Sequence, residues 1–225
     1  MSTRKQRRNR EVRRASDPRM PDPKTYSPET LRNQGLGTER AVIADLDGVF
    51  FQLLDHFGER GVAARLPNEV KIADGLTGEL DKLVAMGFTI IGVTNQPDIA
   101  RDKITPAFLE WKHRQLKGKY PQFKAIFPCT HTEADLCDCR KPKPGLLRQA
   151  AKKFNLDLPR CWMIGDSRAD VEAGMMVGAE TIFIQTQWNC GNPAIDKATA
   201  VATSTRGALK LIAQVESGER NTGDA

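Results

Sequence analysis

The chain has 225 residues, which is enough for one well-packed domain with a tail. Eight basic and two acidic side chains in residues 1–19 account for the whole net charge of +6. The other residues are neutral overall, so the basic character of the chain does not indicate that its folded domain binds nucleic acid. Five cysteines are an odd number, and no signal peptide or long apolar stretch is visible. These features argue against a disulfide-rich secreted protein and a membrane span, and predict a cytoplasmic protein.

Residues 1–38 are predicted to form a disordered basic arm, because they contain few apolar side chains and several prolines. The arm is either a solvated extension without a specific partner or a segment that makes weak contact with nucleic acid. A mitochondrial presequence would need the apolar face of an amphipathic helix, which is missing here. We expect a folded domain over residues 39–218 and a flexible tail over residues 219–225.

From about residue 40, short apolar runs alternate with helical patterns. The expected strands are residues 41–44, 88–93, 124–127, 161–164 and 180–184. The expected helices are one with Leu80, Leu83, Val84 and Met86 on its apolar face, one that begins at Thr105-Pro106, and those at residues 144–151, 171–177 and 207–215. This alternation predicts an α/β fold, an open parallel sheet of Rossmann-like type with helices on both faces.

Two carboxylates, Asp45 and Asp47, follow the first strand two positions apart, so both can face one cleft. Asp166 follows the strand at residues 161–164 and supplies a third carboxylate. Because crowded carboxylates repel one another unless a cation lies between them, and oxygen ligands suit Mg²⁺, the pattern indicates a magnesium site. The alternative for Asp-x-Asp-Gly is a turn or a calcium-like loop.

Thr94, at the end of the second strand, offers a hydroxyl donor beside free backbone N–H groups, and Lys141 offers a positive charge. Ligands of such sheets bind beyond the carboxyl ends of the strands, where these side chains and the three carboxylates converge. Together with Mg²⁺ they form a site suited to a phosphoryl group.

Four soft ligands lie within eleven residues: Cys129 and His131, then Cys137 and Cys139, with one residue inside each pair. Side chains two apart in an extended chain point to the same side, so each pair can bind one ion and a short turn can close a tetrahedral Cys3His zinc site. The alternative is a loop of free thiols without metal. We expect structural zinc that fixes the next residues, Arg140 and Lys141.

Four segments, DLDG, VTNQ, CRKP and GDSRAD, occur in this order and resemble the motifs of the haloacid dehalogenase superfamily of phosphohydrolases. The cluster C-T-H-x5-C-D-C followed by RKPKPG resembles the zinc-bearing subgroup of D,D-heptose 1,7-bisphosphate phosphatases and histidinol-phosphatases. The likeness covers about residues 41–188. It implies the haloacid dehalogenase fold with a zinc-stapled loop. The spacings of 49 residues from Asp45 to Thr94 and of 47 from Thr94 to Lys141 leave no room for a large cap domain.

The resemblance also implies residue roles. Asp45 would be the nucleophile that becomes an aspartyl-phosphate, and Asp47 would be the general acid and base. Asp170 would support the pocket from behind. Mg²⁺ would be held by Asp45, Asp166 and the backbone carbonyl of Asp47. The substrate would be bound by Thr94, Asn95, Gln96, Arg140 and Lys141, of which Thr94 and Lys141 also take part in catalysis.

The expected activity is hydrolysis of a small phosphorylated metabolite, a sugar bisphosphate such as D,D-heptose 1,7-bisphosphate, by a monomeric enzyme. The alternatives are a phosphatase for histidinol phosphate or nucleic acid 3′ ends, and a non-catalytic nucleic-acid-binding module. Leu46, Ser167 and Asp102 depart from the heptose enzymes, which usually have arginine, a basic residue and glycine there. These departures remove no catalytic group but weaken the assignment of the heptose substrate.

Overall fold

The computed structural model describes residues 37–56 and 58–218 of the chain. Contacts divide the chain into two units, Met1–Thr38 and Glu39–Ala225, and the fold described below is that of the second. The predicted basic arm and C-terminal tail lie outside the described residues, except for Gly37 and Thr38. None of the helices in this described part combines the length and apolar character needed to span a bilayer.

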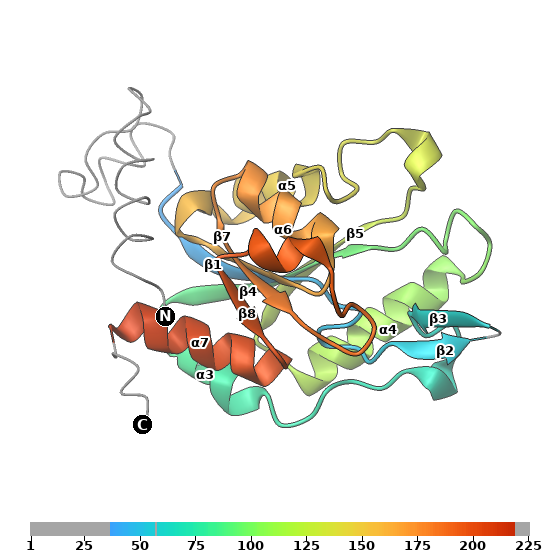
Figure 1. Ribbon diagram of the computed structural model, residues 1–225, viewed down its shortest axis with the longest axis horizontal. Coiled ribbons are helices and arrows are strands. Elements are labelled where there is room, and N and C mark those ends of the chain that lie inside the picture. Colours follow the sequence, from blue (N-terminus) through green and yellow to red (C-terminus); the bar gives the residue numbers. More distant parts are fainter. Residues whose placement is uncertain (1–36, 57, 219–225) are drawn as a thin grey trace. The chain divides into compact units, whose positions relative to one another are not determined.

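A six-stranded sheet forms the centre of the described fold, and all its neighbouring strands pair in parallel. Its spatial order is β5-β4-β1-β6-β7-β8 (Figure 1). The strands are β1 (Arg40–Ala44), β4 (Phe88–Asn95), β5 (Phe123–Cys129), β6 (Trp162–Gly165), β7 (Glu180–Ile184) and β8 (Ala200–Ala202). After β1 the chain builds the sheet in one direction through β4 and β5, and then in the other through β6. Ligands bind such sheets where the strand order reverses, which here is the carboxyl end of β1.

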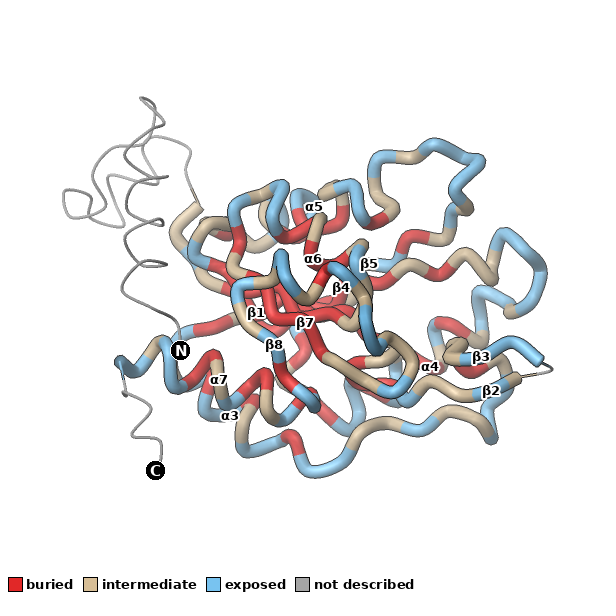
Figure 2. Tube along the Cα trace, in the orientation of Figure 1, coloured by how far each residue is buried: buried red, intermediate tan, exposed pale blue. Residues whose placement is uncertain are grey.

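Helices cover both faces of this sheet. On one face lie α3 (Thr77–Ala85), α4 (Pro106–Lys119) and α7 (Thr205–Ser217), and on the other α5 (Gly145–Phe154) and α6 (Arg168–Met176) (Figure 1). The central strands are buried on both sides, which requires continuous apolar runs (Figure 2). In β1, Val42 packs into the α3/α7 core and Ile43 into the α5/α6 core.

The predicted strands and helices occur close to their expected bounds, and the predicted fold class is confirmed. Thr105 caps α4 as expected, because its hydroxyl accepts from the Phe108 N–H at 3.2 Å and Pro106 follows it. One prediction about the core was wrong: Val84 is 42% exposed, since the buried face of α3 is narrower and carries Leu80 and Leu83.

The structure adds elements that the periodicity did not predict. A small antiparallel hairpin consists of β2 (Leu54–His56) and β3 (Glu59–Val62), and β8 extends the main sheet. Short 3-10 helices occur at Pro67–Glu69, Glu133–Asp135, Leu158–Arg160 and Pro193–Asp196. The hairpin follows the loop after β1, so it lies close in the chain to Asp45 and Asp47.

Candidate active site

The loop after β1 is fixed by the neighbouring strand. The Asp45 N–H donates to the carbonyl of Ile164 at 2.8 Å, which continues the β1–β6 pairing to the first carboxylate. Leu46, between Asp45 and Asp47, is fully buried in the core, while Asp45 is 9% exposed. The buried leucine therefore holds the loop in place between the two aspartates. Gly48 then turns the chain with φ +84°, and a Cβ there would lie 2.0 Å from Asp166 Oδ2. The loop and Asp166 are therefore in direct contact.

Lys141 lies beside Asp45 at the end of β1. Its Nζ donates to Asp45 Oδ1 at 2.7 Å, to Asp170 Oδ1 at 2.6 Å and to the carbonyl of Val93 at 2.9 Å. Burial alone would lower the pKa of the Lys141 ammonium, but the carboxylates of Asp170 and Asp45 raise it above its ordinary value. Lys141 is therefore a buried partner of Asp45, and the two carboxylates beside it favour its charged form.

Asn95 places the Lys141 backbone from the end of β4. Its side-chain amide donates to the Lys141 carbonyl at 2.9 Å and accepts from the Lys141 N–H at 3.0 Å. Substrate contact by Asn95 stays a prediction, because its amide oxygen and one N–H already serve the lysine. These two hydrogen bonds between Asn95 and Lys141 hold the backbone of Lys141 at the end of β4, from where its side chain reaches Asp45.

Three carboxylates lie together at this edge of the sheet. One oxygen each of Asp45, Asp166 and Asp170 lies within 4.8 Å of the others. Burial raises the pKa of Asp166 to about 8, and repulsion from Asp45 and Asp170 adds to this. Burial likewise raises the pKa of Asp45 to about 7, although Lys141 opposes the change. Clustered hard oxygens whose charges repel one another fit a divalent cation such as Mg²⁺.

The Asp47 carboxylate does not belong to this cluster and has partners of its own. Gln96 Nε2 donates to Asp47 Oδ2 at 2.6 Å, and Lys112 Nζ donates to Oδ1 at 2.5 Å. Gln96 also donates to the Thr94 hydroxyl at 2.9 Å, which leaves the Thr94 proton available to a ligand. The Asp47 carboxylate is therefore held by one side chain from the loop after β4 and one from α4, and not by the residues around Asp45.

Lys112 is not among the site residues predicted from the sequence, although the sequence contains a signal for it. The buried residues of α4 are Leu109, Lys112 and Leu116, which lie on one helix face. A lysine among the apolar positions of an amphipathic helix is uncommon, because an unpaired buried charge is costly. That interruption of the apolar face could have indicated an acidic partner.

The four predicted zinc ligands also come together. Cys129 ends β5, and its Sγ lies 3.7 Å from Cys137 Sγ and 3.3 Å from Cys139 Sγ. The Nδ1 of His131 lies 3.6 Å from Cys129 Sγ and 3.3 Å from Cys139 Sγ. Ligands 2.3 Å from a tetrahedral zinc would be separated by roughly 3.8 Å, close to these distances. The four side chains therefore fit a closed Cys3His site.

Arg140 follows Cys139, and its side chain faces the loop after β5 that carries the cluster. Its guanidinium pairs with Glu133 and donates to the His131 carbonyl at 3.4 Å. Arg101 approaches the other Glu133 oxygen at 3.5 Å. Substrate binding by Arg140 stays a prediction, since in this structure a carboxylate of the chain occupies its guanidinium.

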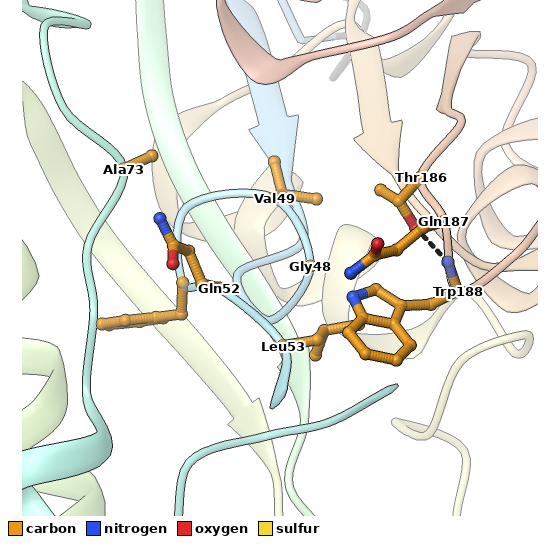
Figure 3. Close-up of a pocket in the computed structure, with 9 residues that line it drawn as sticks. Gly48, Val49, Gln52, Leu53, Ala73, Thr186, Gln187 and Trp188 are labelled. Atoms are coloured by element: carbon orange, nitrogen blue, oxygen red, sulfur yellow. Dashed lines mark hydrogen bonds between the residues drawn. The ribbon is translucent and has the colours of Figure 1, made fainter. Parts of the chain in front are cut away.

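A cavity of about 280 Å³ opens beside the Gly48 turn, between the loop after β1 and the loop after β7. Figure 3 shows the Trp188 indole lying beside Leu53 and Gln187. Asn189 holds the second loop close to the acidic cluster, because it donates to the Asp166 carbonyl at 2.7 Å. The cavity is lined by Gly48, Val49, Phe51, Gln52, Leu53, Ala73, Thr186, Gln187 and Trp188.

Comparisons with known proteins agree with this geometry. A family profile described as HAD-hydrolase-like matches residues 138–205. D-glycero-β-D-manno-heptose-1,7-bisphosphate 7-phosphatase of Pseudomonas putida is 36% identical over 116 residues, 50% of this chain and 66% of that protein, slightly under two-thirds of its length. The Pasteurella multocida protein of the same name is 35% identical over 161 residues, 66% of this chain and 83% of that relative.

A solved structure has the same fold. The crystal structure of D,D-heptose 1,7-bisphosphate phosphatase from B. bronchiseptica, complexed with magnesium and phosphate, superposes with a TM-score of 0.67 at 27% identity. The match covers 79% of this chain and 99% of that one.

Proposed function

Because the chain belongs to the haloacid dehalogenase-like hydrolase family, we propose that it is a magnesium-dependent phosphomonoesterase with Asp45 as nucleophile. The observation that carries this proposal is the contact of Lys141 Nζ with Asp45 Oδ1 at 2.7 Å, beside the carboxylate of Asp166. A carboxylate attacks a dianionic phosphate only when positive charge offsets the repulsion between them.

In the first step, an Asp45 oxygen bonds to phosphorus and the bond from phosphorus to the leaving oxygen breaks. Asp47 donates a proton to that oxygen. In the second step, Asp47 takes a proton from water, the water oxygen attacks phosphorus, and phosphate leaves with Asp45 restored. A positioned acid and base contributes on the order of 10²–10⁴-fold to such a reaction.

The remaining residues bind and neutralise the phosphoryl group. Thr94 donates its hydroxyl proton to a phosphoryl oxygen, and Lys141 holds Asp45 in place. Asp45, Asp166 and the Asp47 backbone carbonyl would hold Mg²⁺, which when bound supplies positive charge opposite the phosphoryl oxygens. Asp170 receives a hydrogen bond from Lys141, which supports its expected role behind the site.

The proposed substrate is a sugar bisphosphate. This choice is supported by relatives named D-glycero-β-D-manno-heptose-1,7-bisphosphate 7-phosphatase. Arg140 and Arg101 both pair with Glu133 in this structure, so either would have to release that carboxylate to bind a second phosphate. Leu46 is fully buried, so this departure from the heptose enzymes does not face a substrate. Ser167 caps α6 and donates to Asp170, which gives it a structural task.

We further propose that the Cys3His cluster holds one structural zinc ion, which fixes the loop leading to Arg140 and Lys141. The proposed setting is reducing and cytoplasmic, because three of the five cysteines are assigned to the zinc site rather than to disulfides. Contact of the N-terminal arm with nucleic acid and the monomeric state stay predictions.

Turnover of p-nitrophenyl phosphate with Mg²⁺, compared between the unaltered chain and Asp45→Asn, tests the proposed reaction. We expect activity in the first and a loss of at least about 10³-fold in the second. Equal rates, or none from either protein, would remove the enzyme assignment. A panel of heptose and other sugar bisphosphates, histidinol phosphate and a 3′-phosphorylated DNA strand then identifies the substrate class.

A further inference from the structure

Lys112 is a buried charge that the proposed reaction does not use. It lies on the core-facing side of α4 between Leu109 and Leu116, and its side chain is 1% exposed. Its Nζ contacts Asp47 Oδ1 at 2.5 Å and lies 4.5 Å from the centre of the Phe51 ring. Both partners belong to the loop after β1, so Lys112 links α4 to that loop.

We infer that Lys112 is a positioning residue, which fixes the Asp47 carboxylate for proton transfer to the leaving group; this inference rests on the proposed function. Lys112 holds Oδ1 while Gln96 holds Oδ2, so both carboxylate oxygens are constrained from different elements. Rotation of the Asp47 carboxylate would break at least one of these contacts.

The two partners also determine where a proton on Asp47 can go. The ammonium of Lys112 and the amide N–H of Gln96 are donors only, so neither can accept a hydrogen bond from a protonated Asp47. A proton on Asp47 must therefore be directed to another acceptor, such as the leaving oxygen. Gln96 also contacts Thr94, which ties the orientation of Asp47 to the residue expected to bind the phosphoryl group.

Stability alone does not account for this lysine. Desolvation of an ammonium offsets much of its attraction to a carboxylate, so a buried ion pair often stabilises a fold no more than a pair of apolar side chains that fills the same space. The neighbouring face of α4 is apolar, so leucine or methionine would suit the packing around Leu109 and Leu116. A lysine there has a clear advantage only through what it does to Asp47.

The test compares phenyl phosphate with p-nitrophenyl phosphate in the full chain with Mg²⁺, using Lys112→Met. Phenolate is the poorer leaving group and depends more on the proton from Asp47. We expect kcat/KM for phenyl phosphate to fall about 100-fold, the scale of loss for a misplaced catalytic group, and that for p-nitrophenyl phosphate to fall about tenfold or less. Lys117→Met, an exposed lysine of the same helix, is the matched control and should leave both values unchanged.

A double-mutant cycle with Asp47→Asn separates positioning from packing. If Lys112 acts through Asp47, Lys112→Met should change kcat/KM less than about twofold when Asp47 is already asparagine. The inference is overturned by additive losses, by equal losses with both substrates, or by a Lys112→Met variant as active as the unaltered chain. Failure of the unaltered chain to hydrolyse either substrate would instead overturn the proposed function.

Folding is checked by thermal melting of each variant. Should Lys112→Met not fold, Lys112→Gln takes its place, since it keeps a polar side chain without the charge. If neither variant folds, Lys112 belongs to the structural core and the inference is overturned.

Discussion

At the scale of single residues, the acidic site depends on contacts that leave no space for additional atoms. Gly48 is the clearest case, because its φ of +84° suits glycine and the space for a Cβ is filled by the Asp166 carboxylate. The loop after β1 can approach Asp166 only without a side chain there. Substitution at this position should therefore affect chemistry more than folding.

Gly48→Ala should lower kcat/KM by about 100-fold, because Asp166 or the loop must move away from Asp45. Gly58→Ala is the matched control, since Gly58 has a similar φ of +82° but nothing within 4 Å of a Cβ. Both variants carry similar backbone strain, so only the first should lose activity. Equal losses in steady-state assays of the two variants would show that strain alone is responsible.

The raised pKa of Asp166 predicts how the thermal stability of the metal-free chain changes with pH. Its pKa rises from 3.8 to about 8 in the folded chain, so stability is lost as the pH rises from about 4 through 8. Asp166→Asn removes this loss. In chelator, its Tm should exceed that of the unaltered chain at pH 8 by about 3 °C or more, and by less at pH 5.

Added Mg²⁺ should reverse this order in thermal melts. The unaltered chain binds the cation and gains stability, while Asp166→Asn lacks a ligand and gains little. An Asp166→Asn variant that melts below the unaltered chain in chelator at pH 8 would contradict the assigned repulsion.

At the scale of elements, the conformation of the loop after β5 depends on the four clustered side chains of the Cys3His site, because the loop has no apolar core of its own. It carries only the short 3-10 helix Glu133–Asp135, and Leu136 is 80% exposed. The start of α5 packs closely on this loop, because a Cβ at Gly145 would lie 2.2 Å from the Asp138 carbonyl. A metal at the Cys3His cluster would therefore stabilise both the loop and the helix after it.

Cys137→Ser should abolish zinc binding and lower Tm by about 5 °C or more, because bound metal contributes directly to folding. Metal analysis by mass spectrometry should find about one zinc per unaltered chain. Cys190→Ser is the control, since Cys190 is exposed and outside the cluster. Zinc retained at full stoichiometry in Cys137→Ser would contradict the assignment of this ligand.

The hairpin β2–β3 is a second element beside the site, and ion pairs connect it to the other loops. Arg65 pairs with Glu59 of the hairpin at 2.5 Å and with Asp98 after β4 at 2.8 Å. The hydrogen bond from Arg65 lowers the pKa of Glu59 to about 2. Arg101 extends these contacts, because it pairs with Asp98 and with Glu133 of the loop after β5. A series of ion pairs therefore connects the hairpin, the loop after β4 and the loop after β5.

The sequence predicted the main strands and helices because their burial is strongly periodic. The run Ala41–Ala44 is buried on both faces, and so it reads as a continuous apolar strand. The hairpin was missed because Glu59 and Arg60 are exposed, so the segment has no apolar pattern that indicates a strand. Tertiary contacts, rather than a local pattern, determine that segment.

At the scale of the whole molecule, the site combines residues that are far apart in the sequence. Asp45 follows β1, Thr94 lies at the end of β4, Asp166 follows β6, and Lys141 comes from the loop beyond the cysteines. Their convergence could be predicted, because parallel strands end at one edge of the sheet. The pairing of Lys112 with Asp47 could not, since helix register against the sheet is set by packing over the whole face.

The central claim is that Asp45 carries the phosphoryl group during turnover. Borohydride added to the chain reacting with p-nitrophenyl phosphate would reduce an aspartyl-phosphate to homoserine, which peptide mass spectrometry locates. Homoserine should appear at position 45, only with substrate and Mg²⁺ present, and not in Asp45→Asn. Turnover with an unmodified Asp45, or homoserine at another aspartate, would contradict the account.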